Sequence, residues 1–218
     1  MKPLVIINFK LYPEAVGRKA VALAVRLSKQ RFSHVQLAFA PPLSTLSEIR
    51  TKTTLPLFAQ HADPVPLGAY TGHLSPEELR RLGIQGTLLN HSERKFSPAQ
   101  VKKTILLCKK NKLITIVCAA SLNEAKKLAM FSPDYIAYEP PALIGGNVSV
   151  TKAKPGIITK VVALIQKTSP KTKLLCGAGI HSSEDLQKAL QLGMHGVLIG
   201  HAVPKAKDPL LKVKQLIS

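Results

Sequence analysis

The strongest constraint on the fold is a regular alternation, along the whole chain, of short apolar segments with segments of helical periodicity. The apolar segments are rich in Val, Ile and Leu at consecutive positions, which is typical of parallel strands covered by helices on both faces. We therefore predict strands over Leu4–Asn8, Val35–Phe39, Leu55–Ala59, Gly86–Asn90, Leu113–Cys118, Tyr135–Tyr138, Lys173–Cys176 and Gly196–Ile199.

The segments between these strands carry helix-start signals. Ser75 and Ser97 each precede a proline, and Ser182 opens a Ser-Ser-Glu-Asp sequence. A serine before proline or acidic residues is a favoured N-cap. We predict helices over Pro13–Gln30, Pro76–Leu82, Pro98–Asn111, Leu122–Phe131, Pro155–Thr168 and Ser183–Leu192.

About eight strand–helix units without an intervening linker predict an α/β fold of the closed (β/α)8 barrel type, with eight parallel strands ringed by helices. The alternative is an open doubly wound sheet, which often has a glycine fingerprint after its first strand. Here that strand ends in Asn8-Phe9-Lys10, without glycine. We expect residues 1–218 to form one domain, with short helices and tight loops because 218 residues are few for this fold.

An internal similarity supports repeated αβ units. Residues 82–91 (LGIQGTLLNH) match residues 192–201 (LGMHGVLIGH). In each copy the first glycine suits a left-handed helix C-cap, and the second suits a tight entry into a strand. The similarity indicates a shared structural unit and does not by itself indicate a function.

The net charge of +19 is the one unusual bulk property. It is compatible with nucleic-acid binding, with attraction of an anionic substrate, or with a basic proteome. The 31 Lys and Arg residues are spread along the chain, with no block of five and few interleaved aromatic residues. Nucleic-acid footprints are more often clustered on one element. The charge therefore argues for an anionic substrate or a solvated surface rather than for nucleic acid.

The sequence also bears on location. No apolar run approaches the roughly 20 residues that cross a bilayer, so no membrane partner is expected. The apolar start is too short for a signal peptide and is better explained as a buried strand. Cys108, Cys118 and Cys176 are widely spaced and odd in number, so we expect buried, reduced thiols and a cytoplasmic protein.

Polar residues follow several predicted strands, at the end where (β/α)8 barrels carry their catalytic groups. Each of them alone has an ordinary explanation, such as a solvated lysine or a loop-bracing histidine. Together they form four segments that occur at strand ends: Asn8-Phe9-Lys10, Asn90-His91-Ser92-Glu93-Arg94, Tyr138-Glu139-Pro140-Pro141-Ala142-Leu143-Ile144-Gly145 and Cys176-Gly177-Ala178-Gly179-Ile180.

These segments resemble the signature segments of the triosephosphate isomerase family, in the same order and over nearly the whole chain. The compact length and the segments 59–64 (AQHADP) and 205–209 (KAKDP) are most similar to the short archaeal branch. The resemblance implies interconversion of D-glyceraldehyde 3-phosphate and dihydroxyacetone phosphate through an enediolate, with no cofactor and no metal.

The resemblance also implies roles for individual residues. Glu139 would be the base that moves a proton between C1 and C2, and His91 a neutral electrophile at the carbonyl oxygen. Lys10 would stabilise negative charge, Asn8 would help to hold the substrate oxygen, and Glu93 would stand behind Lys10. A weakly acidic proton next to a carbonyl requires a general base together with donors for the developing oxyanion.

Further roles concern phosphate binding, a lid and the subunit interface. Residues 140–151 would close over the substrate, with Pro140 and Pro141 stiffening one end and Gly146 at the tip. Thr71 lies in a loop that in this family reaches a neighbouring subunit, which implies a homo-oligomer, either a dimer or a tetramer. The implied phosphate-binding residues are Ile144, Gly145, Gly179, Gly200 and His201.

Three positions depart from the family pattern. Gly146 stands where a threonine is usual, so closing the lid should cost more order. His181 and His201 replace small residues beside the phosphate. Either only their backbone N–H groups matter, or a protonated His201 adds attraction for the phosphate dianion. Other phosphate-binding barrel enzymes and a basic binding protein on a barrel scaffold are the competing interpretations.

Overall fold

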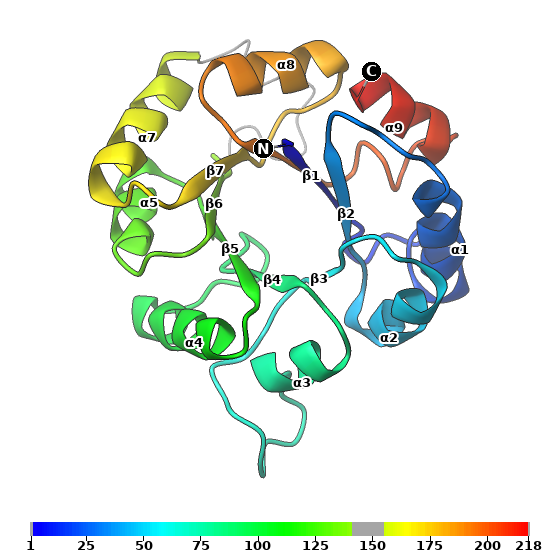
Figure 1. The fold of residues 1–218 in the computed structure, drawn as a ribbon, viewed down its shortest axis with the longest axis horizontal. Coiled ribbons are helices and arrows are strands. Elements are labelled where there is room, and N and C mark those ends of the chain that lie inside the picture. Colours follow the sequence, from blue (N-terminus) through cyan, green and yellow to red (C-terminus); the bar gives the residue numbers. More distant parts are fainter. Residues whose placement is uncertain (1, 141–154, 218) are drawn as a thin grey trace.

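Eight parallel strands form one sheet in a computed structural model that describes residues 2–140 and 155–217. Helices form an outer ring around this sheet (Figure 1). The strands are β1 (Leu4–Asn8), β2 (Gln36–Ala40), β3 (Phe58–Ala59), β4 (Gly86–Leu89), β5 (Ile114–Ala119), β6 (Tyr135–Tyr138), β7 (Lys173–Cys176) and β8 (Gly196–Ile199).

The helices of the described residues lie between successive strands and after the last one. This arrangement, with every strand followed by a crossover on the outside, is the (β/α)8 barrel predicted from the sequence. The helices are α1 (Gly17–Ser28), α2 (Leu43–Lys52), α3 (Pro76–Arg81), α4 (Pro98–Lys110), α5 (Leu122–Ala129), α7 (Pro155–Thr168), α8 (Ser183–Gln191) and α9 (Pro209–Ile217).

The barrel closes between β2 and β3 through the weakest pairing of the sheet. The neighbours follow the order β2-β1-β8-β7-β6-β5-β4-β3, and a single parallel bridge joins Phe39 to Leu57. β3 is only two residues long, shorter than the predicted Leu55–Ala59. Pro56 has no N–H to donate, and the N–H of Leu57 donates to Gln85 Oε1 instead of to a neighbouring strand.

Two apolar layers hold the barrel together. On β1, Leu4 and Ile6 belong to the layer inside the barrel, whereas Val5 and Ile7 face the surrounding helices. This alternation of two buried faces explains why the strands are apolar at consecutive positions. The inner layer consists of Leu4, Ile6, Ala38, Ala40, Phe58, Leu88, Ile116, Cys118, Ala137, Leu175 and Leu198.

The repeated LG…G segments have the predicted conformations. Gly83 and Gly193 follow their helices with φ of 72° and 95°, in the left-handed region that favours glycine. Gly86 and Gly196 begin their strands against neighbouring backbone. A Cβ at Gly86 would lie 2.2 Å from the carbonyl oxygen of Ile114. These four glycines therefore set the entry angle of β4 and β8.

The predicted helix starts at Ser75, Ser97 and Ser182 are also confirmed. Each serine side chain accepts a hydrogen bond from a backbone N–H of its helix, at 3.2 to 3.3 Å. Helix α1 begins at Gly17 rather than at the predicted Pro13, because the chain first makes a turn closed by the N–H of Ala15 on the carbonyl of Tyr12.

Helices α2 and α9 lie outside the helices predicted from the sequence. α2 follows Pro42 and has no side-chain cap, so the start signal was missing. α9 follows Asp208, whose carboxylate accepts hydrogen bonds from the N–H groups of Leu210 and Leu211. The three cysteines are buried and free, as predicted. Within the described residues, no helix is both long enough and apolar enough to span a membrane.

Candidate active site

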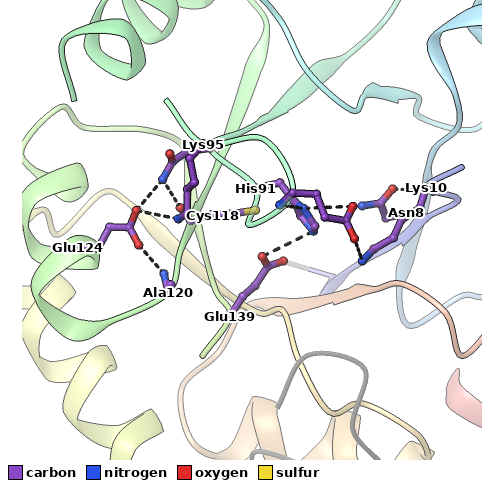
Figure 2. A network of polar contacts seen from close by, with 10 residues as sticks. Asn8, Lys10, His91, Lys95, Cys118, Ala120, Glu124 and Glu139 are labelled. Atoms are coloured by element: carbon purple, nitrogen blue, oxygen red, sulfur yellow. Dashed lines mark hydrogen bonds and ion pairs between the residues drawn. The ribbon is translucent and has the colours of Figure 1, made fainter. Parts of the chain in front are cut away.

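The carboxyl ends of three strands bring the four predicted catalytic residues to one pocket. Asn8 ends β1, His91 follows β4 by two residues, and Glu139 directly follows β6. Together with Lys10 they line one pocket at this end of the barrel. Figure 2 shows the side chains of Lys10, His91 and Glu139 directed toward one another.

Lys10 is held in position from several sides. Its backbone has a φ of 49°, and its N–H donates to Asn8 Oδ1 at 3.0 Å. Gln60 Nε2 donates to the carbonyl of Lys10 at 3.1 Å. The ammonium group forms an ion pair with Glu93, with Nζ and Oε1 2.6 Å apart. A left-handed lysine is uncommon, and these contacts fix the cation at the pocket wall.

His91 is set up as a neutral hydrogen-bond donor. The backbone N–H of Glu93 donates to its Nδ1 at 3.2 Å, so Nδ1 carries the lone pair and Nε2 carries the proton. Burial lowers the pKa of His91, and the neighbouring Lys10 lowers it further, against the opposing charge of Glu93. The Nε2 atom lies 3.8 Å from Glu139 Oε2, with both atoms at the pocket.

Glu139 has a buried carboxylate group with one oxygen atom that is not hydrogen-bonded to any described residue. Its residue is 3% exposed, and its Oε2 has no hydrogen-bond partner among the described residues. Burial raises the pKa of Glu139 to about 7, and the thiol of Cys118 and the charge of Lys10 oppose that shift. A carboxyl group with a pKa near neutral pH is well matched to accept a proton from carbon.

The backbone beside Glu139 leaves little room. A Cβ added at Gly177 would lie 2.3 Å from Glu139 Cγ and 2.9 Å from its Oε1. Gly177 follows β7, the neighbour of β6 in the sheet. The glycine therefore lets the carboxylate occupy its place against the next strand, a role that the sequence analysis had not assigned.

A second group of residues, whose role was not predicted from the sequence, supports the loop that carries His91. Asn90 has a φ of 58°, and its side-chain amide donates to the carbonyl of Cys118 and to Glu124 Oε1, both at 2.9 Å. Lys95 forms an ion pair with the same glutamate at 2.8 Å (Figure 2). An asparagine at a strand end was a readable signal for a left-handed residue. Glu124, on α5, gave no such signal.

The predicted phosphate-binding residues that the structure describes line the same pocket. They are Gly179, Gly200 and His201, in the turns after β7 and β8. The Lys10 side chain lies close to Gly200. A Cβ added at Gly200 would be 3.3 Å from Lys10 Cε. Pro140 lies next to Glu139 and is partly buried. The predicted positions Pro141, Ile144, Gly145 and Gly146 lie outside the described residues.

Thr71 is far from this pocket in its own chain. It is exposed, in the segment between β3 and α3 that extends away from the barrel in Figure 1. Among the described residues, no cluster of three or more His, Cys, Asp or Glu side chains could hold a metal ion. The pocket thus combines a buried carboxyl group, a neutral N–H donor and a fixed cation.

Such a pocket at the carboxyl ends of barrel strands defines a class: barrel enzymes that move a proton on a small anionic substrate. Comparison with known proteins identifies the family. The family model described as triosephosphate isomerase matches residues 3–217. The chain belongs to the triosephosphate isomerase family, as the resemblance of its motifs predicted.

Several archaeal proteins named triosephosphate isomerase are similar over nearly their whole length. The protein of Saccharolobus solfataricus is 41% identical over 217 residues, covering 99% of this chain and 95% of its own. The protein of Methanobrevibacter smithii is 39% identical over 217 residues, covering 99% and 98%. That of Methanocaldococcus jannaschii is 39% identical over 215 residues, covering 98% of both chains.

Proposed function

We propose that this chain interconverts D-glyceraldehyde 3-phosphate and dihydroxyacetone phosphate. The observation that carries the proposal is the buried Glu139 carboxylate, whose Oε2 has no hydrogen-bond partner among the described residues and lies 3.8 Å from Nε2 of a neutral His91. The family and the names of the relatives support the choice of substrate.

In the proposed reaction, Glu139 removes a proton from the carbon next to the carbonyl and returns it to the neighbouring carbon. The Nε2–H of His91 donates to the oxygen that becomes negative in the enediolate. Lys10 balances that charge, and Asn8 helps to hold the substrate oxygen. Glu93 positions Lys10 through their 2.6 Å ion pair. Fixed donors in a water-excluded pocket are the usual means of stabilising such an oxyanion.

The phosphate group is proposed to bind at the other end of the pocket. Backbone N–H groups of Gly179, Gly200 and His201 are the candidate donors, joined by Ile144 or Gly145 when residues 140–151 close over the substrate. In that lid, Pro140 and Pro141 limit motion at one end and Gly146 supplies freedom at the tip. Closing would exclude water from the enediolate.

We also propose that the chain acts as a single domain, residues 1–218, in a cytoplasmic homo-oligomer, a dimer or a tetramer. A second hollow beside Lys10 supports the oligomer, because Pro42, Leu43 and Arg94 are among the residues that line it and Leu11, also in its lining, is 74% exposed. A neighbouring subunit's loop around Thr71 would cover this surface.

The test is a coupled assay of glyceraldehyde 3-phosphate conversion on wild type, Glu139→Gln and Glu48→Gln. Glu48 is exposed on α2 and pairs with Lys52, so its variant makes the same charge change away from the pocket. We expect conversion by wild type and Glu48→Gln, and a loss of about 100-fold or more in Glu139→Gln, because a positioned base contributes about 10²–10⁴. A folded wild type without conversion would refute the proposal.

A further inference from the structure

Two histidines stand together at the phosphate end of the pocket. His181 lies between β7 and α8, and His201 follows β8. Both line the pocket, and their ring centroids are 5.8 Å apart with the planes tilted by 58°. Neither ring has a role in the proton transfer proposed above.

The backbone of His181 is held by two hydrogen bonds, whereas its ring atom Nε2 has none to the described residues. The backbone N–H donates to Asp185 Oδ2 at 2.9 Å, and the backbone carbonyl accepts from Lys212 Nζ at 2.8 Å. The ring atom Nε2 is buried and has no hydrogen-bond partner among the residues that the structure describes. A buried polar atom without a partner is costly, and at a pocket it is a candidate ligand contact.

The surroundings of His201 are strongly cationic. Burial lowers the pKa of His201, and His181, Lys10 and Lys205 lower it further. The empty pocket therefore disfavours a proton on the ring, whereas a dianion at the same place would favour it. Other charged or titratable groups around the pair are His91, Glu139 and Tyr12 in the pocket lining, Asp185 on α8 and Lys212 on α9.

We propose that His181 and His201 bind the phosphoryl group of the substrate through ring N–H groups, and that the pair takes up a proton from solvent when a dianion binds. The proposal depends on the proposed function, since it assigns the same pocket to a phosphorylated substrate. It makes the two side chains, and not only their backbone, part of the phosphate site.

Inorganic sulfate is the probe, because sulfate stays a dianion over the pH range in which histidine titrates. The background is Glu139→Gln, which removes the pocket carboxyl group whose pKa is raised to about 7. Calorimetry measures the sulfate dissociation constant at about pH 6 and about pH 8. We expect about tenfold tighter binding at the lower pH, the effect that a rise of about one and a half units in a histidine pKa has between these two pH values. Proton uptake should appear as a dependence of the binding enthalpy on the buffer.

Two further variants in this background, His181→Gln and His201→Asn, keep polar side chains but cannot take up a proton. We expect each to reduce the difference between the two pH values to less than about threefold, in line with the lost histidine charge. His34→Gln is the matched control, because His34 precedes β2 at the opposite end of the barrel and contacts the carbonyl of Ile217. It should bind sulfate like the parent. Unfolding midpoints check that the variants fold.

Three results would overturn the proposal. The first is that the variants keep the full pH dependence. The second is that they weaken binding equally at both pH values, which a structural role would explain. The third is that sulfate does not bind to the parent at all. If Glu139→Gln binds sulfate with the expected pH dependence but wild type has no isomerase activity, the proposed function is refuted, whereas the assignment of the two histidines as a dianion site stands.

Discussion

At the residue scale, the active-site groups are held in states that are unfavourable before substrate binds. Glu139 is buried at 3% exposure, and Oε2 lacks a partner among the described residues. His91 is kept neutral by burial and by Lys10. Both features raise the energy of the empty pocket and favour the transition state of the proposed reaction, in which a proton would move to Glu139 and His91 would donate to an oxyanion.

The first prediction concerns the pH dependence of the reaction. Glu139 acts as a base only when ionised, and its pKa is raised to about 7. We expect kcat/KM at about pH 6.5 to be about one quarter of its plateau value at about pH 9. The comparison begins at about pH 6.5 because the phosphate group of the substrate itself titrates near about pH 6. A profile that is level across this range would contradict the assigned base.

The second prediction concerns stability. The unfolded chain loses the Glu139 proton near the ordinary pKa of 4.5, whereas the folded protein keeps it to about pH 7. The free energy of unfolding of wild type therefore falls as pH rises through this window. Glu139→Gln has no carboxyl group to titrate and does not lose stability in this way. The free energy of unfolding of the variant minus that of wild type should therefore rise by roughly 3 kcal/mol between about pH 4.5 and about pH 8.

Urea unfolding at one protein concentration measures this difference at both pH values. Titrating groups remote from residue 139 cancel when the variant is compared with wild type. Glu48→Gln, at an exposed site, should show a gap that stays within about 0.5 kcal/mol. A constant gap for Glu139→Gln would mean that the carboxylate is not destabilised by burial.

At the element scale, the site depends on close packing between neighbouring strand ends. β6 and β7 are adjacent, and the glycine that follows β7 leaves space for the side chain that follows β6. The turn after β4 is similarly braced, since Asn90 connects it to the end of β5 and to α5. The positions of Glu139 and of the turn that carries His91 are thus set by the strand next to each.

The third prediction tests this packing. Gly177→Ala places a Cβ where Glu139 Cγ lies 2.3 Å away, so the carboxylate must move. We expect kcat to fall about 100-fold, because a shift of about 1 Å in a reacting group has that order of effect. Gly156→Ala is the control, since the same methyl group meets no atom within 4 Å there. Equal activity of the two variants in the coupled assay would contradict the assigned role of Gly177.

At the scale of the whole molecule, the net charge of +19 surrounds a site that takes a phosphate dianion in our account. Lys10, Lys205 and Lys212 lie at or near the pocket. A field of one sign attracts an oppositely charged substrate over long distances and weakens as salt screens it.

The fourth prediction follows from that field. Raising NaCl from about 20 to about 300 mM should lower kcat/KM for glyceraldehyde 3-phosphate several-fold, because the screening length shortens across this range. Unphosphorylated glyceraldehyde, which carries no charge, is the control and should show little change. Equal salt dependence for both substrates would show that the charge serves another purpose.

The sequence predicted the fold because every strand and most helices carry their own signal. Consecutive apolar residues marked β1 and β8, and serine caps marked α3, α4 and α8. β3 and α2 were predicted less well from the sequence. The limits of β3 depend on Gln85 from another αβ unit, and α2 begins after Pro42 without a side-chain cap. The pocket residues Asn8, Lys10, His91 and Glu139 were readable as polar residues at strand ends.

Other parts of the site could not be read in this way. The contact of Gly177 with Glu139 and the link from Asn90 to Glu124 join residues 34 to 38 positions apart. Nor did the sequence reveal that His181 and His201 approach each other, since that depends on the curvature that brings β7 and β8 together. Local sequence patterns predict which residues lie at the carboxyl ends of the strands, whereas tertiary packing determines which of these residues are in contact.

The most direct test of the central claim follows the proton itself. Dihydroxyacetone phosphate is incubated in D₂O with wild type or Glu139→Gln, and proton NMR records deuterium on carbon. We expect rapid deuterium incorporation by wild type and a rate lower by about 10²–10⁴ in the variant, the usual contribution of a general base. Wild type that is folded yet incorporates no deuterium, or a variant that exchanges as fast as wild type, would contradict the account.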